Sequence, residues 1–388
     1  MYDYIIVGSG FSGSVIARKI AQELDKKVLI LEKRPHIAGN MYDEIDAESG
    51  VLVQRYGPHT FVTDDPEIVD FVRQYDNWRD YYVHAQVEID DKLMPIPFNF
   101  KSVEIFYSQD KAQTLIDKLK SAFTGQERVP VFALTDHSDQ MIREFGELLY
   151  EKDYIPYTCK QWGIPPDKMD RSVLARVKFA LSYDDVYMQQ KYQMMPSVGF
   201  TQVFENMLNH PNITVQTSID ALNDLMFDHE GHCVRYQGEK LPVVFTGPID
   251  ELFGLKFGRL PYRSIDIEYE VKDVDRIQET PIITYPQASR KTRTTEYKLL
   301  TGQVVPEKTL VATESPVEYT PDQKTGNVPF YPVINDENLA QYKRYRKLAD
   351  SFKNLYVCGR LGDYKYYNMD AAISRALEVY HQVRVDHE

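Results

Sequence analysis

The chain has 388 residues, of which 43% are apolar and 27% charged, and it carries a net charge of −13. This length allows two or three packed units, and the acidic charge argues against sequence-independent binding to nucleic acid or to an anionic membrane. No apolar run approaches the ~20 residues of a transmembrane helix, and the N-terminus lacks the basic region of a signal peptide. The three cysteines are too widely spaced for a zinc site. We therefore expect a cytoplasmic protein with reduced thiols, no bound metal and no membrane insertion.

The first forty residues predict a nucleotide-binding unit. A short apolar strand, Tyr4–Val7, is followed by a glycine turn, Gly8–Gly13, with the pattern G-x-G-x-x-G, and then by apolar residues at helical spacing. A second strand, Val28–Leu31, ends in the acidic residue Glu32. This order of strand, turn, helix, strand and acid is the context in which the glycine pattern indicates dinucleotide binding.

Each glycine of this turn has a predicted task. Gly8 permits a tight turn, Gly10 lets the backbone approach a pyrophosphate, and Gly13 allows the helix to pack closely on the strand. The free N–H groups and the dipole of the helix N-terminus then attract the anion. Glu32 is expected to accept hydrogen bonds from a ribose diol and to repel a 2′-phosphate, which favours FAD or NAD over NADP.

Farther along the chain, the periodicity changes twice. From about 64 to 190, apolar residues recur at helical spacing and predict a largely helical segment, with helices at Pro66–Tyr75, Lys111–Phe123 and Asp139–Tyr150 and candidate N-caps at Asp64, Asp65 and Asp139. After Pro196, short apolar or alternating runs predict strands again, followed by a C-terminal helix. The strand candidates include Ile213–Val215, Leu241–Phe245, Ser264–Tyr269, Thr309–Thr313 and Asn354–Gly359, and the helix is Asp370–Tyr380.

Two further segments favour FAD over NAD. Lys33–Asn40 resembles the R-x-x-x-G-G segment that follows the second strand in the glutathione-reductase-like flavoproteins, with Ala38 in the first glycine position. Tyr356–Arg360 resembles their later flavin-contacting strand, and a helix that begins near Asn368 can stabilise negative charge on a reduced flavin.

We therefore predict an α/β fold with three parts. A Rossmann-like, glutathione-reductase-like FAD-binding domain is discontinuous and comprises 1–80, 196–255 and 338–388. Segment 81–195 is predicted to be a mainly helical substrate lid with a mobile loop. Segment 256–337 is predicted to be an antiparallel β-sheet domain that faces the substrate.

A set of collinear stretches is far more specific than the glycine pattern alone. These stretches are Tyr2–Gly10, Tyr56–His59, Pro97–Asn99, Tyr157–Gly163, Thr246–Asp250, Tyr262–Ser264, Thr292–Arg293, Pro329–Pro332 and Gly359–Tyr367. Through them the sequence resembles, over nearly its whole length, the bacterial flavin-dependent UDP-galactopyranose mutases.

The resemblance implies an enzyme that interconverts UDP-galactopyranose and UDP-galactofuranose and supplies galactofuranose for cell-surface polysaccharide. In this family, N5 of the reduced FAD attacks the anomeric carbon, a flavin–sugar iminium forms, and the sugar ring recloses through another hydroxyl without net redox change. Because the cofactor is the nucleophile, no Ser/His/Asp or Cys/His set is needed. A UDP-galactose-type nucleotide sugar is the implied partner, and a homodimer is the implied assembly.

The resemblance also assigns roles to individual residues. The implied substrate residues are Tyr157, Thr158, Trp162, Tyr192, Arg293, Tyr331 and Tyr366. Tyr157 and Trp162 flank the uridine with Tyr192 nearby, the arginine grips the diphosphate with its planar fork of donors, and the last two residues donate hydrogen bonds to the phosphates.

The implied catalytic residues are Arg293, Lys178, His59 and Arg360, of which the last two lie beside the flavin. The implied cofactor residues are Gly8, Gly10, Phe11, Ser12, Gly13, Glu32, Lys33, Gly39, Asn40, Tyr56, Gly57, His59, Arg360, Tyr367, Asn368 and Met369.

Three positions depart from the family pattern. Val62 stands where the family has a second histidine, Asn368 replaces an aspartate, and Lys178 stands where an arginine of the mobile loop clamps the diphosphate, with Arg176 close by. Because these changes affect phosphate and sugar contacts, the same chemistry on UDP-N-acetylgalactosamine or dTDP-fucopyranose is an alternative. Two further alternatives are an amine-oxidase-like flavoprotein oxidase and a nucleotide-sugar-binding protein without turnover.

Overall fold

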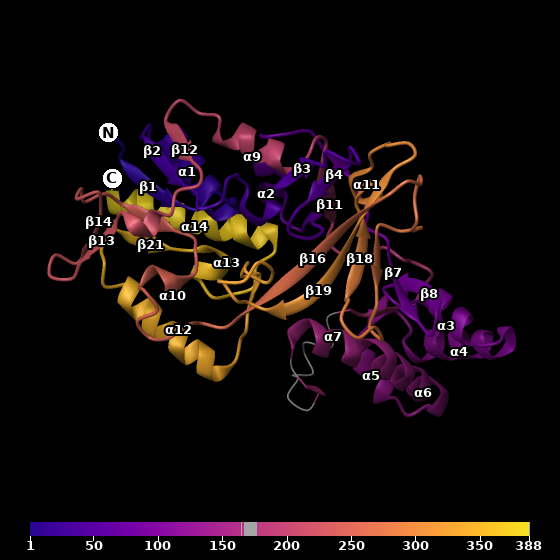
Figure 1. Cartoon of the computed structure of the whole chain (residues 1–388). Helices are drawn as coiled ribbons and strands as arrows, with labels where there is room; N and C mark the ends of the chain where they lie inside the picture. Colours follow the sequence, from indigo (N-terminus) through magenta and orange to yellow (C-terminus); the bar gives the residue numbers. More distant parts are fainter. Residues whose placement is uncertain (164, 167–176, 388) are drawn as a thin grey trace.

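A five-stranded parallel sheet forms the centre of the first structural unit in the computed structural model, which describes residues 1–163, 165–166 and 177–387 (Figure 1). The sheet order is β12 (Ile213–Gln216), β2 (Val28–Leu31), β1 (Tyr4–Val7), β15 (Val243–Phe245) and β21 (Leu355–Val357). The chain order along the sheet reverses between β1 and β15, and ligands of such folds bind at this switch point. The predicted α/β, Rossmann-like class is confirmed.

Both faces of this sheet are buried, which explains its continuous apolar strands. Tyr4 and Ile6 of β1 pack into one core, whereas Ile5 packs into another core on the opposite face. The first face is covered by α1 (Phe11–Glu23), α2 (Pro66–Val72), α9 (Phe200–Leu208) and α14 (Met369–His387). The second face is covered by α10 (Ile249–Leu252), α12 (Asp336–Ala349), a 3-10 turn (Ala221–Asn223) and the hairpin β13–β14 (Leu225–Asp228, Cys233–Tyr236).

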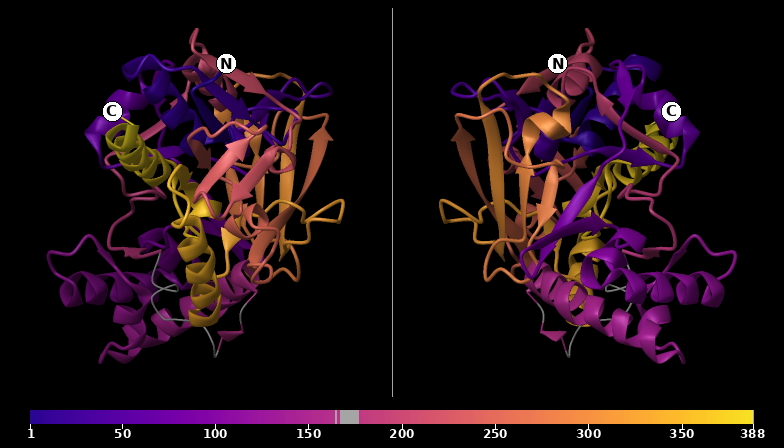
Figure 2. Two further views of the ribbon diagram at one scale, coloured as in Figure 1. Left: turned by 90° about the vertical axis from the view of Figure 1, so that its left-hand side faces the viewer. Right: turned by 90° about the vertical axis from the view of Figure 1, so that its right-hand side faces the viewer.

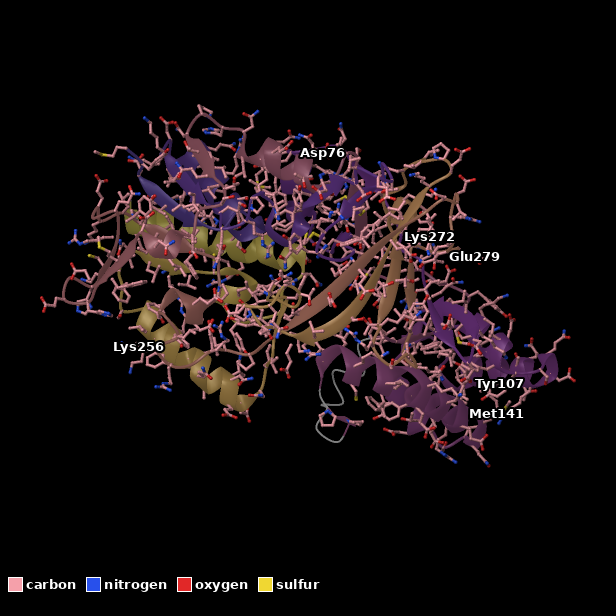
Figure 3. The ribbon with its side chains drawn as sticks, viewed as in Figure 1. Asp76, Tyr107, Met141, Lys256, Lys272 and Glu279 are labelled. Carbon is pink, nitrogen blue, oxygen red and sulfur yellow. The ribbon has the colours of Figure 1, made fainter. Side chains whose placement is uncertain are left out.

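A seven-stranded sheet forms the second unit. Its order is β20 (Tyr331–Pro332), β16 (Tyr262–Lys272), β19 (Thr309–Glu318), β18 (Arg293–Glu296), β17 (Ile282–Thr284), β7 (Ala85–Ile89) and β8 (Lys92–Ile96). All neighbours are antiparallel except β17 and β7. Figure 3 shows how β16 runs from the middle of the molecule to Lys272 at its outer end.

Helices cover one end of this second sheet and lie away from the parallel sheet (Figure 2). They are α3 (Phe100–Phe106), α4 (Gln109–Ala122), α5 (Val131–Thr135), α6 (Gln140–Leu149) and α7 (Ile155–Trp162), with the short pair β9 (Arg128–Val129) and β10 (Phe179–Ala180). Asp65 and Asp139 cap α2 and α6, as predicted. The cap prediction for Asp64 is wrong, because its carboxylate accepts a hydrogen bond from the Lys191 backbone instead.

The helix that contains α6 and α7 widens into one π turn, Tyr150–Tyr154. The N–H of Ile155 donates to the carbonyl of Tyr150, five residues back. Pro156 follows at the start of α7 and has no N–H to donate, so the regular pattern cannot continue through it. The π turn, of a kind that is frequent at functional sites, lets the helix continue to Trp162.

Short strands, short helices and a 3-10 turn join the two units. They are β5 (Phe61–Thr63), β11 (Tyr192–Pro196) and β6 (Trp78–Asp80) in one sheet, β3 (Asp43–Ile45) and β4 (Leu52–Gln54) in another, with α11 (Tyr297–Thr301), α13 (Gly359–Gly362) and a 3-10 turn (Gly39–Met41). The prediction of helix was wrong over 78–96, where β6, β7 and β8 lie. Their strand state depends on pairing with the distant strands β11 and β17.

Among the described helices, none is long and apolar enough to span a membrane.

A buried aspartate links β3 to α9 and provides a stability test. The Asp43 carboxylate accepts hydrogen bonds from the N–H groups of Phe200 and Thr201, at 2.7 and 2.8 Å. Asp43→Ala would leave these N–H groups without their partner, and we expect it to lower the free energy of unfolding by about 1–2 kcal/mol. Urea unfolding measures the change.

Asp65→Ala is the matched control, because Asp65 caps α2 through the Glu67 N–H at an exposed position. Water can replace that bond, so the loss should be smaller. An equal or larger loss for the control would contradict the importance of the buried cap.

Candidate active site

The glycine turn connects β1 to α1 through contacts that exclude larger side chains. Gly8 has φ +100°, and a Cβ atom there would lie 2.2 Å from Oγ1 of Thr246. A Cβ atom at Gly13 would lie 2.0 Å from the Gly8 carbonyl oxygen. The first turn of α1 has no acidic residue, and its N-cap, Gly10, has no side chain to cap it. Its N–H groups can therefore bind an anionic ligand.

Glu32 holds the glycine turn against the end of β2. One carboxylate oxygen accepts hydrogen bonds from the N–H and the hydroxyl of Ser9, at 2.9 and 2.7 Å, and the other accepts from the Arg34 N–H at 2.9 Å. The side chain is buried. Glu32 thus braces the turn, a role that the sequence did not predict. Its contact with a ribose stays a prediction.

The segment after β2 approaches the glycine turn closely. Gly39 has φ +56°, and a Cβ atom there would lie 3.0 Å from the Gly10 Cα. Arg34 stacks its guanidinium over the ring of Tyr56, 4.3 Å from the centroid, and donates to Asn40 at 3.0 Å. The other terminal nitrogen of Arg34 is buried and has no hydrogen-bond partner among the described residues.

These segments surround a cavity of about 580 Å³ at the switch point of the parallel sheet. The predicted cofactor residues that line it are Gly8, Gly10, Phe11, Ser12, Glu32, Lys33, Gly39, Asn40, Tyr56, Arg360, Tyr367, Asn368 and Met369. Gly13 lies behind this lining, and Gly57 and His59 belong to the second cluster described below. The sequence analysis did not assign Arg34, Thr246 or Gly359, which also line the cavity.

The second cluster is centred on an ion pair between neighbouring strands. Arg293 of β18 faces Glu314 of β19, and Nε and Oε2 lie 2.8 Å apart. Glu314 is 2% exposed. Burial alone would lower the pKa of Arg293, but the Glu314 carboxylate raises it above its usual value and keeps the guanidinium charged. The sequence analysis missed Glu314, because only strand pairing shows that it faces the arginine.

Gly57 lies directly against this pair. Its φ is +90°, and a Cβ atom there would lie 3.4 Å from a terminal nitrogen of Arg293 and 3.5 Å from Glu314. These distances are ordinary van der Waals contacts, so the positive φ is what favours glycine at this position. Gly57 therefore shapes the cluster rather than the cavity.

Aromatic residues from three elements surround Arg293. Tyr331 of β20 lies 5.8 Å from the Tyr366 ring and 6.4 Å from the Trp162 ring at the end of α7. Burial raises the pKa of Tyr331, and Arg293 and Arg360 partly offset this rise. Tyr331 therefore stays protonated and can donate a hydrogen bond.

Tyr157 of α7 belongs to the same cluster. Burial raises its pKa, and the charge of Arg293 acts in the opposite direction. Thr158 follows it at a half-buried position of the helix. The structure thus brings together the predicted substrate residues Tyr157, Trp162, Arg293, Tyr331 and Tyr366.

Arg360 of α13 connects the cluster to the cavity, which it lines. Its guanidinium lies 5.6 Å from the ring centroid of Tyr331 and 5.0 Å from that of Tyr366. It donates to the backbone carbonyls of Phe330, at 3.2 Å, and Tyr367. These bonds fix a positive charge between the two sites.

His59 lies near both arginines and is neutral. Burial, followed by the charges of Arg360 and Arg293, lowers its pKa to about 3. Gln54 holds this loop, accepting from the His59 N–H at 2.5 Å and donating to its carbonyl at 3.1 Å. The Nδ1 atom of His59 is buried and forms no hydrogen bond with the side chains of the described residues.

The other predicted substrate residues lie outside this cluster or outside the residues that the structure describes. Lys178 is exposed just before β10, and Arg176 lies outside the described residues. Tyr192 lies in β11 opposite Thr63, with the Lys191 ammonium 5.0 Å from its ring centroid. The substrate roles of Lys178 and Tyr192 stay predictions.

Comparisons with known proteins agree with this geometry. Residues 152–366 match the family model described as UDP-galactopyranose mutase, and residues 6–75 match the NAD(P)-binding Rossmann-like domain. The UDP-galactopyranose mutase of Mycoplasma pneumoniae is 34% identical, over 97% of this chain and 94% of that protein. The dTDP-fucopyranose mutase of Escherichia coli is 31% identical, over 97% of both chains. A crystal structure of reduced UDP-galactopyranose mutase has the same fold, with a TM-score of 0.71 and 16% identity over 99% of this chain and 94% of that one.

The neutral state of His59 predicts a pH dependence of stability. Its pKa is lower in the folded protein than the usual 6.5, so between about pH 6.5 and pH 3 the unfolded chain binds more protons at this residue. Relative to His59→Gln, the wild type should lose stability as the pH falls through this range, by at most about 1.4 kcal/mol per pH unit. Urea unfolding at pH 7, 6 and 5 measures the difference.

The exposed His229 offers the control. His229→Gln should follow the wild-type profile at each pH. If His59→Gln also follows that profile, the ring is not buried in its neutral form.

Proposed function

Because the chain belongs to the UDP-galactopyranose mutase family, we propose that it interconverts UDP-galactopyranose and UDP-galactofuranose at the Arg293 cluster. The observation that carries the proposal is the charged, deeply placed Arg293, paired with Glu314, beside Tyr331 and Trp162. This arrangement suits a diphosphate joined to a flat base. The product would supply galactofuranose for cell-surface polysaccharide.

The cavity next to the cluster fits FAD. The uncapped start of α1 would bind the pyrophosphate, the close approach of Gly10 and Gly39 would leave room for it, and Glu32 would bind the ribose. The partnerless nitrogen of Arg34 gives the cofactor a further donor. When bound and reduced, FAD supplies the electron-rich N5 that reacts with the anomeric carbon of the sugar.

The protein groups bind and position the substrate. Arg293 offers two terminal N–H groups to the diphosphate while Glu314 holds its Nε side. Tyr331 donates its hydroxyl proton to a phosphate oxygen, and the rings of Tyr157 and Trp162 hold the uridine. Lys178 and Tyr192 complete the site in this proposal.

Arg360 and His59 affect how well the site accommodates the negative charge of the reduced cofactor. Arg360 places a positive charge between cavity and cluster, where it stabilises an anionic reduced flavin. His59 is neutral and adds no further positive charge, and its Nδ1 can hydrogen-bond to the flavin or the sugar. No side chain serves as a nucleophile in this scheme.

The preferred sugar is a separate question, because Val62 is less polar than the histidine of the family pattern. Val62 lies in β5, is 7% exposed and pairs with Gln193 of β11. An apolar side chain there, together with the relative that is a dTDP-fucopyranose mutase, favours dTDP-fucopyranose as the second candidate substrate. UDP-N-acetylgalactosamine is the third.

The first test is turnover. The FAD-loaded protein, reduced with dithionite under anaerobic conditions, should convert UDP-galactofuranose into UDP-galactopyranose, as measured by chromatography. The two alternative nucleotide sugars are assayed in parallel to rank the substrates. Stoichiometric oxygen consumption with peroxide formation, in place of isomerisation, would identify an oxidase, and tight UDP binding without any conversion would identify a binding protein.

A second test concerns the diphosphate. Arg293→Lys keeps the charge beside Glu314 but loses the planar fork, so we expect UDP to bind the oxidised protein at least about tenfold more weakly. Fluorescence titration measures the dissociation constant. Arg290→Lys is the control, because the Arg290 side chain is 74% exposed.

Lys178→Ala, made alongside, measures the contribution of the exposed lysine and should weaken UDP binding less than Arg293→Lys. Binding by Arg293→Lys within twofold of the wild type would contradict the proposed diphosphate site.

A further inference from the structure

A lysine of α7 connects the aromatic residues of the cluster to the hairpin that carries Arg293. The Lys160 ammonium donates hydrogen bonds to the backbone carbonyls of Tyr285, at 2.6 Å, and of Lys291, at 3.0 Å. Tyr285 directly follows β17, and Lys291 lies two residues before Arg293, which begins β18. Figure 1 shows α7 beside the lower end of β19, the strand that pairs with β18. Lys160 has no role in the reaction proposed so far.

From Lys291 the connection continues to the buried ion pair. Thr292 comes next, and its N–H and hydroxyl both donate to the backbone carbonyl of Glu314, at 2.8 and 3.3 Å. Arg293 follows and pairs with the Glu314 side chain. The ammonium of Lys160 is therefore attached to the backbone that determines where the Arg293 guanidinium lies.

On α7 the same lysine lies close to the residues that we assign to the uridine. Tyr157 precedes Lys160 by three residues, and side chains at this spacing are neighbours on one face of a helix. Trp162 follows two residues later, and its ring centroid lies 6.4 Å from that of Tyr331. One ammonium group thus joins the helix that carries the aromatic residues to the strands that carry the guanidinium.

The end of α7 is fixed at a second point. Gly163 ends the helix with φ +65°, and a Cβ atom there would lie 2.7 Å from a terminal nitrogen of Arg263. Arg263 lies in β16 opposite Tyr331 of β20. The end of the helix therefore packs against the strands beside Tyr331, while Lys160 holds the middle of the helix against the hairpin of Arg293.

The two carbonyls replace an ion pair. Among the described residues, no carboxylate pairs with the half-buried Lys160, and the nearby Lys291 ammonium lies 3.5 Å from the Tyr285 ring centroid. Burial and then the charge of Lys291 lower the pKa of Lys160 to about 8, so the group is charged at neutral pH. Burying a charge is costly unless it is hydrogen-bonded, and the Tyr285 and Lys291 carbonyls provide these bonds.

We propose that Lys160 is a positioning residue that sets the separation between the uridine side of the active site, on α7, and the diphosphate side, at Arg293. A nucleoside diphosphate contacts both sides at once, so this separation determines how tightly it binds. The inference rests on the proposed function, which assigns Tyr157 and Trp162 to the base and Arg293 to the diphosphate. Lys160 acts through the helix and the hairpin and not by contact with the ligand.

Binding at two points makes this role measurable. When one ligand binds two sites in a fixed geometry, the second contact forms at a high effective concentration, and this advantage is lost if the sites move apart. A fragment that binds only one side has no such advantage. Loosening of α7 should therefore weaken the binding of UDP and leave uridine and pyrophosphate unaffected. Damage to the fold would weaken all three ligands.

The test uses the oxidised, FAD-loaded protein at pH 7 and the substitution Lys160→Met, which keeps an unbranched side chain but removes its N–H donors. Fluorescence titration measures UDP binding, and ligand-observed NMR, which detects weak binding, measures uridine and pyrophosphate. UDP should bind Lys160→Met at least about tenfold more weakly than the wild type, and each fragment should bind within about twofold of it. Lys160→Arg, which keeps charged donors, should recover most of the UDP affinity, and Lys160→Gln, which keeps a neutral donor, should fall between them.

Lys291→Met is the matched control. It removes the same charge from the partner loop, but the Lys291 carbonyl that accepts from Lys160 belongs to the backbone and stays in place. Its UDP affinity should stay within about twofold of the wild type. An equal loss in Lys291→Met and Lys160→Met would assign the effect to charge and overturn the positioning role. Unchanged UDP binding in Lys160→Met, or an equal loss for UDP and a fragment, would also overturn it.

Failure of the proposed function gives a different result. A wild-type protein that binds neither UDP nor a nucleotide sugar would refute both proposals. A wild type that isomerises UDP-galactofuranose while Lys160→Met binds UDP unchanged would refute the positioning role alone.

Discussion

The ion pair between Arg293 and Glu314 sets the electrostatics of the whole active-site cluster. A guanidinium at this depth is tolerated because a buried carboxylate on the neighbouring strand compensates its charge. Gly57 lies directly against the pair. Arg293 and Arg360 both disfavour a charged His59 ring, and burial keeps the hydroxyl of Tyr331 protonated. The pair thus supplies charged N–H donors, and Arg360 adds a positive charge beside Tyr331 and Tyr366.

The two structural units meet at Arg360. The parallel sheet and the glycine turn border the cavity, and the seven-stranded sheet carries Arg293, Glu314 and Tyr331 of the cluster. Arg360 lines the cavity and lies beside Tyr331 and Tyr366 of the cluster. A positive charge shared by both sites is suited to chemistry in which the cofactor reacts directly with the substrate.

The helix that carries Tyr157 and Trp162 is irregular because of a proline. Pro156 cannot donate a backbone hydrogen bond, so one turn widens.

The sequence alone determined the features whose physics is local. The strand, the glycine turn, the helix and Glu32 all lie between Tyr4 and Glu32, and close contacts inside that unit or next to it require glycine at Gly8 and Gly13. The resemblance to the mutase family also identified Arg293, Tyr331, Tyr366 and Trp162, which the structure brings together.

Only the tertiary structure decided the rest, because it depends on partners far apart in the chain. The state of β7 follows from pairing with β17, nearly two hundred residues away. Strand register places Glu314 opposite Arg293, and burial together with the two arginines lowers the pKa of His59. A carboxyl or imidazole group has the same formula at every position in a sequence. Its charge state and its partner are set by the low-dielectric surroundings that folding assembles around it.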